Sequence, residues 1–277
     1  MGTGYSYGMS DRIPYEVCPL CQHGERSSIG SASCESHPMW TQELCAPMVD
    51  WLQCEHCGHV HTTGYFNHEQ TSLLAKRSLE HQRFSLEEAE QGRFLQGQLL
   101  NRVIPLLPHG EGGRWLDVGY GNGSLLLTAK EYGFKVVGID TRPDSVQTLR
   151  NLEVDARQGD FFSVYPEKER FSVVSMCDVL EHMPFPKEAL LRARELLDHE
   201  GGILVISCPN IDSPIWQPLT EAGQNPYWGE LEHYHNFGRA RLYDLLRECG
   251  FTPLRYSVSE RYRMGMEIVA RVSPQMP

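Results

Sequence analysis

The run Trp115-Leu-Asp117-Val-Gly119-Tyr-Gly121-Asn-Gly123 carries more information about this chain than any other stretch. An apolar segment of strand length breaks there into a Gly-x-Gly-x-Gly turn. Glycine adopts positive φ angles at little cost and has no Cβ, so the backbone of such a turn can lie directly against a ligand. The pattern therefore predicts a strand-to-helix turn at a nucleotide-like cofactor site.

The spacing of the glycines narrows the kind of cofactor. Dinucleotide-binding turns carry Gly-x-Gly-x-x-Gly, whereas this turn has Asp117 two positions before the first of three alternating glycines. This difference disfavours a nicotinamide dehydrogenase. On the turn alone, an ordinary tight connection without a ligand remains the alternative.

Beyond the turn, apolar runs of strand length alternate with helix-like segments. This alternation predicts a doubly wound α/β fold with a seven-stranded, mostly parallel sheet and helices on both faces. Ligands of such sheets bind outside the carboxyl ends of the strands. The expected strands are residues 114–118, 135–139, 154–158, 171–177, 202–208, 251–256 and 267–271.

Five blocks in this order resemble the class I S-adenosylmethionine-dependent methyltransferases, over residues from about 85 to 277. The resemblance implies a Rossmann-like fold and S-adenosyl-L-methionine as cofactor. The blocks are the glycine turn, the acid that follows residues 136–139, the turn at residues 159–161, the segment 171–182 with its Leu-Glu-His end, and the segment 195–210 with its Gly-Gly turn and Pro-Asn end.

The resemblance also implies roles for single residues. The glycines would pass beneath the methionine and ribose. Asp140 would accept hydrogen bonds from both ribose hydroxyls, since a carboxylate has two acceptor oxygens. The alternative is that Asp140 is a solvated charge or a helix cap. Asp160 would accept from the adenine amine, with Phe161 or Phe162 stacking on the ring. Tyr120 is bulkier than the family's usual residue and is expected to crowd the pocket or cover its methionine end. The predicted cofactor-binding residues are Asp117, Gly119, Tyr120, Gly121, Asp140, Thr141, Asp160, Phe161 and Cys177.

Histidines are the candidate catalytic groups. Methyl transfer requires mainly alignment, with a base when the acceptor is a hydroxyl, and histidine titrates near neutral pH. His233 is the preferred base and His235 the next, while His182 serves either as a base or as a brace of the cofactor loop. Asp178, Glu181 and His182 together are a further candidate site for a divalent ion, as their spacing resembles that of some quinone-precursor O-methyltransferases.

The long segment between Asn210 and His233 contains Trp216, Tyr227, Trp228 and several prolines. Its length and position predict a lid over the substrate. Its aromatic residues favour a ring, a sugar or an apolar substrate, unless they only pack the segment against its own domain.

Two Cys-x-x-Cys pairs, Cys18 with Cys21 and Cys54 with Cys57, predict a structural zinc ion held by four thiolates. A redox dithiol, or a mixed site that uses Cys34, Cys45 or nearby histidines, is the alternative. The module resembles zinc ribbons that precede some methyltransferase domains.

We therefore expect a zinc-ribbon-like module at residues 1–68, a helical lead-in at 69–107, and a methyltransferase domain at 108–277. Within the lead-in, Ser85-x-x-Glu88 predicts a helix start, and an apolar stripe that includes Leu86 and Phe94 is expected to be buried.

Charge and composition limit the partners. The formal net charge is −11 and no basic run is present, which argues against nucleic-acid binding, since that relies on clustered Lys and Arg. No apolar run approaches the length of a membrane span and no secretory signal is evident, so a cytoplasmic protein is expected. The sequence gives no indication of oligomeric state.

The favoured function is O-methylation of a small sugar-like or aromatic metabolite. The alternatives are an RNA or protein methyltransferase that docks its substrate on the zinc ribbon, and a non-catalytic binding protein.

Overall fold

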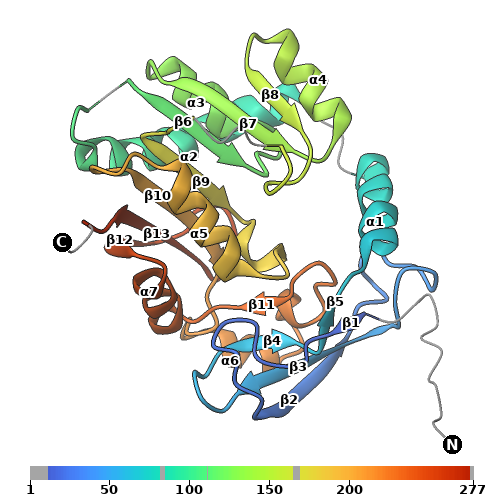
Figure 1. The fold of residues 1–277 in the computed structure, drawn as a ribbon. Helices are drawn as coiled ribbons and strands as arrows, with labels where there is room; N and C mark the ends of the chain where they lie inside the picture. The colour runs from blue at the N-terminus through green and yellow to red at the C-terminus, as the bar shows by residue number, and fades with distance from the viewer. Residues whose placement is uncertain (1–11, 82–84, 111, 165–168, 275–277) are drawn as a thin grey trace, which may run out of the picture. The chain divides into compact units, whose positions relative to one another are not determined.

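The computed structural model describes residues 12–81, 85–110, 112–164 and 169–274 (Figure 1). The contacts of the chain separate it into two compact units. The smaller unit consists of the chain up to residue 82 together with Pro214–Asn236, and the larger unit consists of Arg83–Ser213 and Phe237–Pro277. The predicted boundaries at residues 68 and 107 therefore fall inside the two units, and the smaller unit also includes a segment from later in the chain.

The larger unit is built on a seven-stranded sheet whose strand order is β12-β13-β10-β9-β6-β7-β8 (Figure 1). Strands β6 to β10 pair in parallel, whereas β13 is antiparallel to both β10 and β12. All seven predicted strands are therefore confirmed, as is the mostly parallel sheet. The strands are β6 (Arg114–Val118), β7 (Lys135–Asp140), β8 (Asp155–Gln158), β9 (Val173–Cys177), β10 (Ile203–Pro209), β12 (Phe251–Val258) and β13 (Gly265–Val272).

Helices pack against this sheet and complete its core. Leu99 and Leu100 of one helix, Leu126 of the next and Trp115 of β6 belong to one buried apolar cluster. None of the described helices combines the length and the apolar character that a membrane crossing requires. The helices of the unit are α2 (Leu86–Val103), η1 (Ile104–Leu106), α3 (Ser124–Glu131), α4 (Pro143–Asn151), η2 (Leu180–His182), α5 (Pro186–Leu196) and α7 (Arg239–Glu248).

Helix α2 begins where the sequence predicts. The Ser85 side chain accepts a hydrogen bond from the Glu88 backbone N–H at 3.3 Å, which satisfies one of the free donors of the first turn. The expected apolar stripe is only partly buried, because Leu86 is 55% exposed and Phe94 is 72% exposed. The buried face is narrower and includes the polar Gln96.

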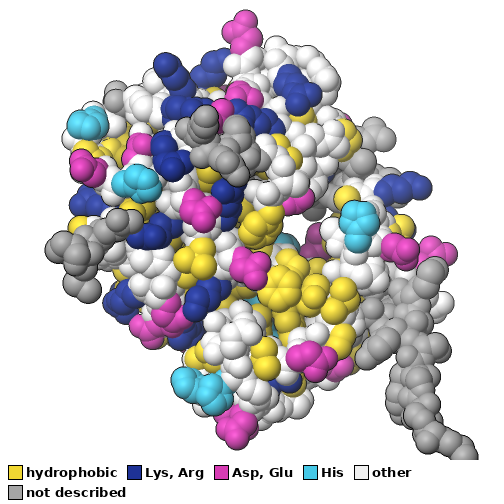
Figure 2. Space-filling view, viewed as in Figure 1, with side chains coloured by type: hydrophobic (Ala, Val, Ile, Leu, Met, Phe, Trp, Pro, Cys, Tyr) yellow, Lys and Arg dark blue, Asp and Glu magenta, His cyan; other side chains and the backbone are white. Residues whose placement is uncertain are grey.

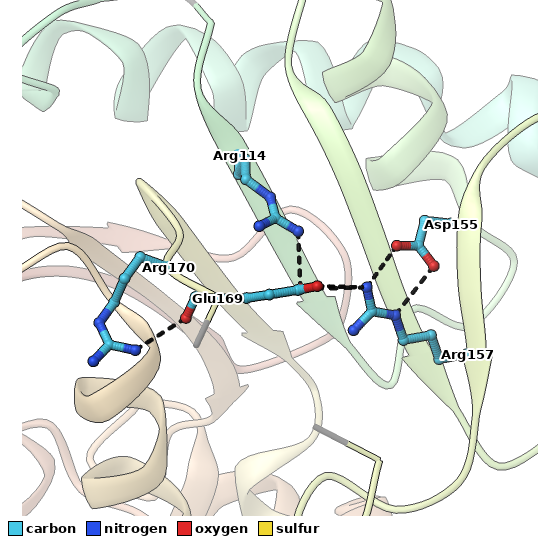
Figure 3. Close-up of polar contacts among 5 residues, drawn as sticks. All are labelled: Arg114, Asp155, Arg157, Glu169 and Arg170. Atoms are coloured by element: carbon cyan, nitrogen blue, oxygen red, sulfur yellow. Dashed lines mark hydrogen bonds and ion pairs between the residues drawn. The ribbon is translucent and has the colours of Figure 1, made fainter. Parts of the chain in front are cut away.

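An ion-pair network links β6 and β8 to the residues that precede β9 (Figure 3). Arg114 at the start of β6 and Arg157 of β8 both donate to the Glu169 carboxylate, at 2.9 and 3.3 Å. Arg157 also binds Asp155 with two hydrogen bonds, of 2.6 and 3.1 Å, and Arg170 donates to the backbone oxygen of Glu169. The network thus links two strands that are not neighbours in the sheet through one carboxylate.

The smaller unit contains a four-stranded sheet of order β11-β4-β3-β2 and a separate pair, β1 with β5. Its last strand, β11, follows Ser213 in the chain by more than twenty residues and pairs with β4 (Figure 1). The elements are β1 (Ile13–Pro14), β2 (Arg26–Ser33), β3 (Met48–Cys54), β4 (Val60–Thr62), β5 (Gly64–Tyr65), α1 (His68–His81), α6 (Trp216–Glu221), η3 (Pro226–Trp228) and β11 (His235–Asn236).

The aromatic residues of the predicted lid segment are part of the packing of the smaller unit. Trp216 stacks on Tyr227 at 5.4 Å between ring centroids, and Trp228 meets the buried Trp51 edge to face at 5.4 Å. The Trp51 indole N–H donates to the Trp228 carbonyl at 2.9 Å. These contacts support the alternative that the aromatic residues pack the segment against its own unit.

Candidate active site and cysteine cluster

The glycine turn joins β6 to α3 as predicted. Gly119, Gly121 and Gly123 have φ angles of 64°, 59° and 72°, in the left-handed region that favours glycine. The Gly119 N–H donates to Ile139 O at 2.8 Å, which ties the turn to the carboxyl end of β7. The turn therefore lies at the edge of the sheet where ligands of such folds bind.

Two of these glycines have different surroundings. A Cβ on Gly119 would lie 2.7 Å from Cγ2 of Val179, whereas a Cβ on Gly121 would meet no atom within 4 Å. The space beside Gly121 is therefore open, which fits a backbone that receives a ligand. Tyr120 is buried in the core cluster, and its ring carbons lie 2.6 and 2.8 Å from where a Gly138 Cβ would be. Its ring thus packs on β7, which argues against its covering the methionine end of the pocket.

The difference between Gly119 and Gly121 makes a testable prediction. Gly119→Ala should lower the free energy of unfolding by about 2–4 kcal/mol, because it combines a strained φ with a steric clash. Gly121→Ala, the matched control, should cost only the strain, about 1–2 kcal/mol. Urea unfolding of both variants measures the difference; equal losses would contradict the clash with Val179.

Asp140 lies at the end of β7, beside the glycine turn. It is only 6% exposed, and its Oδ2 accepts from the Gly121 N–H at 3.3 Å. Arg142 binds the same carboxylate with its backbone N–H and two guanidinium nitrogens, at 2.9, 3.0 and 2.9 Å. The carboxylate is thus placed where the resemblance predicts, but its oxygens are shared with an arginine that the sequence reasoning did not identify.

Asp117 is a buried carboxyl group in β6. Its Oδ1 accepts from the Ser175 hydroxyl at 2.6 Å, and Ser175 in turn accepts from the Trp115 indole. Burial raises the pKa of Asp117 to about 7, which the Ser175 hydrogen bond opposes. A positively charged ligand group beside this carboxyl would stabilise its ionised form.

Arg261 is a second basic residue at the carboxyl ends of the strands that the sequence analysis missed. Its Nε lies 3.0 Å from Oδ2 of Asp178, whose other oxygen accepts from the Ser207 hydroxyl at 2.9 Å. Asp178 has a φ of 58°, which is unusual for a residue with a Cβ. Because its carboxylate is already paired with Arg261, Asp178 is poorly suited to act as a metal ligand beside Glu181 and His182.

The remaining predicted cofactor residues lie at the ends of neighbouring strands. Asp160 follows β8, and its carboxylate closes its own turn by accepting from the backbone N–H groups of Phe162 and Ser163 at 2.8 and 3.1 Å. Phe161 is buried, whereas Phe162 is 51% exposed. Thr141 is an exposed residue directly after β7, and Cys177 is the buried last residue of β9. A contact of Asp160 or Phe161 with adenine remains a prediction.

The three candidate bases belong to different units. His182 is the half-buried last residue of η2 in the larger unit, next to the buried Glu181. His233 and His235 belong to the smaller unit. His233 is 6% exposed and stacks on Tyr227 at 5.8 Å. His235 is fully buried with its Nδ1 3.0 Å from Nε2 of His59, which favours a structural role.

The four predicted ligand cysteines converge. All four sulfurs lie within 4.8 Å of one another, with Cys18 to Cys57 at 3.8 Å and Cys21 to Cys54 at 3.5 Å. Four sulfurs at about 2.3 Å from a tetrahedral ion would be about 3.8 Å apart. The donor set and spacing therefore fit a zinc ion.

Both cysteine turns have the same backbone geometry. The N–H groups of Cys18 and Cys54 each donate to the carbonyl five residues later, at 2.8 and 2.9 Å. The residues four positions after them, Gln22 and Gly58, each donate back to the cysteine carbonyl and have φ angles of 63° and 70°. Glycine adopts such a φ angle readily, whereas glutamine rarely does, so the turn at Gln22 has no signal in the sequence.

Comparisons with known proteins identify the family of the larger unit. A family model described as a methyltransferase domain matches residues 88–256, more than half of the chain. The ubiquinone biosynthesis O-methyltransferase of Cereibacter sphaeroides is 28% identical over 154 residues, which cover 52% of this chain and 62% of that protein. The enzyme of the same name from Nitrosococcus oceani is 31% identical over 180 residues, covering 57% and 73%. The chain thus spans about three fifths of the length of the Cereibacter relative.

Solved structures show the same fold. Magnesium protoporphyrin IX methyltransferase from Synechocystis PCC 6803, with bound SAH, has a TM-score of 0.51 at 19% identity, and the match covers 76% of this chain and 90% of that one. A chain from a complex of the Haloferax volcanii Trm112 methyltransferase activator with a methyltransferase has a TM-score of 0.53 at 13% identity, covering 68% and 93%. The protein therefore belongs to the methyltransferase domain family and has the fold of the class I S-adenosylmethionine-dependent methyltransferases.

Proposed function

We propose that the protein transfers a methyl group from S-adenosylmethionine to an oxygen of a small sugar-like or aromatic biosynthetic intermediate. The main observation in favour of S-adenosylmethionine as the cofactor is the open space beside Gly121, next to the Asp140 carboxylate. Support for oxygen as the acceptor comes from the curated relatives, which are named as O-methyltransferases. When bound, the cofactor supplies an electrophilic methyl group.

The residues of the larger unit would hold the cofactor by complementary chemistry. Asp140 would accept hydrogen bonds from vicinal hydroxyls, and Asp117 would face positive charge in a buried position. The backbone at Gly121 has open space beside it, so a ligand can approach it without a side chain in the way. The same residues suit an adenosine-based sulfonium better than a neutral metabolite.

The charge distribution supports a small acceptor. On the face shown in Figure 2, acidic side chains lie among the basic ones. The net charge of the whole chain is −11. This negative net charge disfavours an RNA substrate, which requires clustered positive charge.

A histidine would remove the proton of the acceptor hydroxyl. His233 is our first candidate and His182 the second; His235 ranks last because His59 occupies its Nδ1. Glu181 and His182 are the remaining candidates for a divalent ion, since Asp178 is bound to Arg261. The four-cysteine cluster would hold a zinc ion with no open coordination position, so its role would be structural.

Transfer of radiolabel tests the proposal. Purified protein is incubated with methyl-labelled S-adenosylmethionine and a cell extract. A hydroxylated aromatic or sugar compound of the extract should become labelled, whereas its RNA and protein should not. His233→Gln should lower kcat about 100-fold or more if His233 is the base, with cofactor affinity unchanged. His182→Gln, tested in the same way, decides between the two histidines. Label found only in macromolecules would contradict the small-acceptor proposal.

A further inference from the structure

Strand β2 leaves one edge of the four-stranded sheet of the smaller unit open. It is the last strand of this sheet, and in the part of the chain that the structure describes it pairs with β3 alone. None of its residues is buried, and a bulge between Ser28 and Gly30 is followed by regular pairing up to Ser33. Residues 27–33 include no charged residue and no proline, two features that commonly keep other strands away from such an edge. The edge is therefore able to accept a further strand.

The register of β2 with β3 determines which main-chain groups face outward. The Cys34 N–H donates to Pro47 O at 2.9 Å, so these two residues form a hydrogen-bonded pair of the antiparallel ladder. Since hydrogen-bonded and non-hydrogen-bonded pairs alternate, Ser33 and Ser31 direct their N–H and C=O groups away from β3. The position of Ser33 O agrees, because a Cβ on Gly229, which lies outside the sheet, would be only 2.5 Å from it. Ser31 and Ser33 thus offer main-chain groups spaced as in a sheet.

A groove of about 800 Å³ lies beside this edge. Residues 29–33 line it together with residues of α6, of η3 and of the turns around them, and all of these belong to the smaller unit. Trp228 gives the groove an aromatic wall, and its indole N–H donates to Thr220 Oγ1 at 2.9 Å, which fixes the ring. A strand rises about 3.4 Å per residue, so residues 29–33 span roughly 17 Å. The groove therefore has the length and the main-chain groups that an extended peptide of about five residues requires.

A histidine and two carboxylates meet at the same groove. His37 and Glu230 line it, and each has a nitrogen or oxygen atom within 4.8 Å of a carboxylate oxygen of Glu232. His37 Nε2 lies 2.8 Å from Glu230 Oε1, and the Met39 N–H donates to His37 Nδ1 at 3.2 Å. The ring hydrogen is therefore on Nε2, where it points to Glu230 and leaves no lone pair for a metal ion. The two carboxylates make the group negatively charged, which suits the ammonium of a Lys or the guanidinium of an Arg.

We propose that the groove binds an extended peptide segment of another protein, which pairs with β2 and places a Lys or Arg side chain on the Glu230 carboxylate. The main chain of the peptide bonds to the outward groups of Ser31 and Ser33, and alternate side chains face the wall that includes Trp228. The main-chain bonds supply affinity for extended segments in general, and the acidic group selects among them. The site goes beyond methyl transfer, because it lies entirely in the smaller unit and uses none of the residues of the candidate cofactor site.

Selection from a library of displayed random six-residue peptides tests the proposal on the full chain with its metal bound. The selected peptides should be enriched in Lys or Arg. The best of them, synthesised with a fluorescent label, should bind at least about tenfold more weakly to Glu230→Gln. Glu35→Gln is the matched control and should bind like the unaltered protein, because Glu35 is an exposed acid near His37 in the chain that does not line the groove. A library that yields no binder, or a binder whose affinity Glu230→Gln leaves unchanged, would overturn the proposal.

Amide exchange measured by nuclear magnetic resonance tests the pairing with β2. In the free protein the amides of Ser31 and Ser33 should exchange fast, whereas those of Gly30 and Ala32, which bond to β3, should be protected. The selected peptide should slow exchange at Ser31 and Ser33 at least about tenfold and leave Gly30 and Ala32 nearly unchanged. Ser31→Pro removes an outward N–H and no bond to β3, so it should weaken peptide binding about tenfold while the metal content stays the same. A bound peptide that does not slow exchange at Ser31 and Ser33 would overturn the added strand.

Discussion

Removal of the proposed zinc ion should unfold the smaller unit and leave the larger unit folded. Zinc binding contributes about 10–16 kcal/mol in small metal-stapled modules, and the four sulfurs that would hold it come from both ends of the N-terminal segment. The sequence predicts the zinc-ribbon-like module at residues 1–68. The structure extends it to residues 214–236, because β11 pairs with β4 and Trp228 packs on Trp51.

Hydrogen exchange with and without a chelator measures this effect region by region. Residues 48–65 and 226–236 should lose protection together, whereas β6, β9 and β10 should keep it. Cys54→Ser should reproduce the effect of the chelator. The control is Cys249→Ser, which replaces a buried cysteine of the larger unit and should bind as much zinc as the unaltered protein. Metal analysis that finds much less than one zinc per chain, or protection that survives chelation, would contradict the assignment.

The fold of the larger unit was predictable because most of its strands and helices can be recognised from residues that are neighbours in the sequence. The central strands β9 and β10 and most of β6 and β7 are short apolar runs followed by turn signals, and the Ser85 cap marks the start of α2. The positions of Gly119 and Asp140 relative to these strands then place them at one edge of the sheet. Their placement needs only the topology and no knowledge of individual side-chain contacts.

The features that sequence reasoning missed depend on contacts between distant residues. The strand β11 has two residues, and only its pairing with His61 and Val60, more than 170 positions away in the chain, defines it. Arg142 and Arg261 carry no motif, since a basic residue in a loop is ordinarily solvated. What distinguishes them is the carboxylate that each one binds, which is visible only in three dimensions. Arg142 binds the buried Asp140, two residues before it, and Arg261 binds the half-buried Asp178, 83 residues before it.

Loss of the Asp140 carboxylate should abolish tight cofactor binding. Hydrogen bonds to a charged acceptor are worth about 1.5–3 kcal/mol each, and two ribose hydroxyls would donate to Asp140. Asp140→Ala should therefore weaken S-adenosylmethionine binding at least about 100-fold by calorimetry. Asp140→Asn keeps the volume and removes the charge, so it should weaken binding by a similar factor while preserving the fold. Asp144→Ala, which removes an exposed acid four residues later, is the control.

The pairing of Asp140 with Arg142 sharpens this experiment. The guanidinium holds both carboxylate oxygens at 2.9–3.0 Å, so ribose hydroxyls would have to compete with it or share the remaining lone pairs. If they compete, Arg142→Met should tighten binding, because the displaced ion pair no longer opposes it. If they share, Arg142→Met should weaken binding slightly by removing the group that orients the carboxylate. Unchanged affinity in both Asp140→Ala and Asp140→Asn would show that the carboxylate serves only to hold Arg142, and that the cofactor is bound elsewhere on the sheet edge.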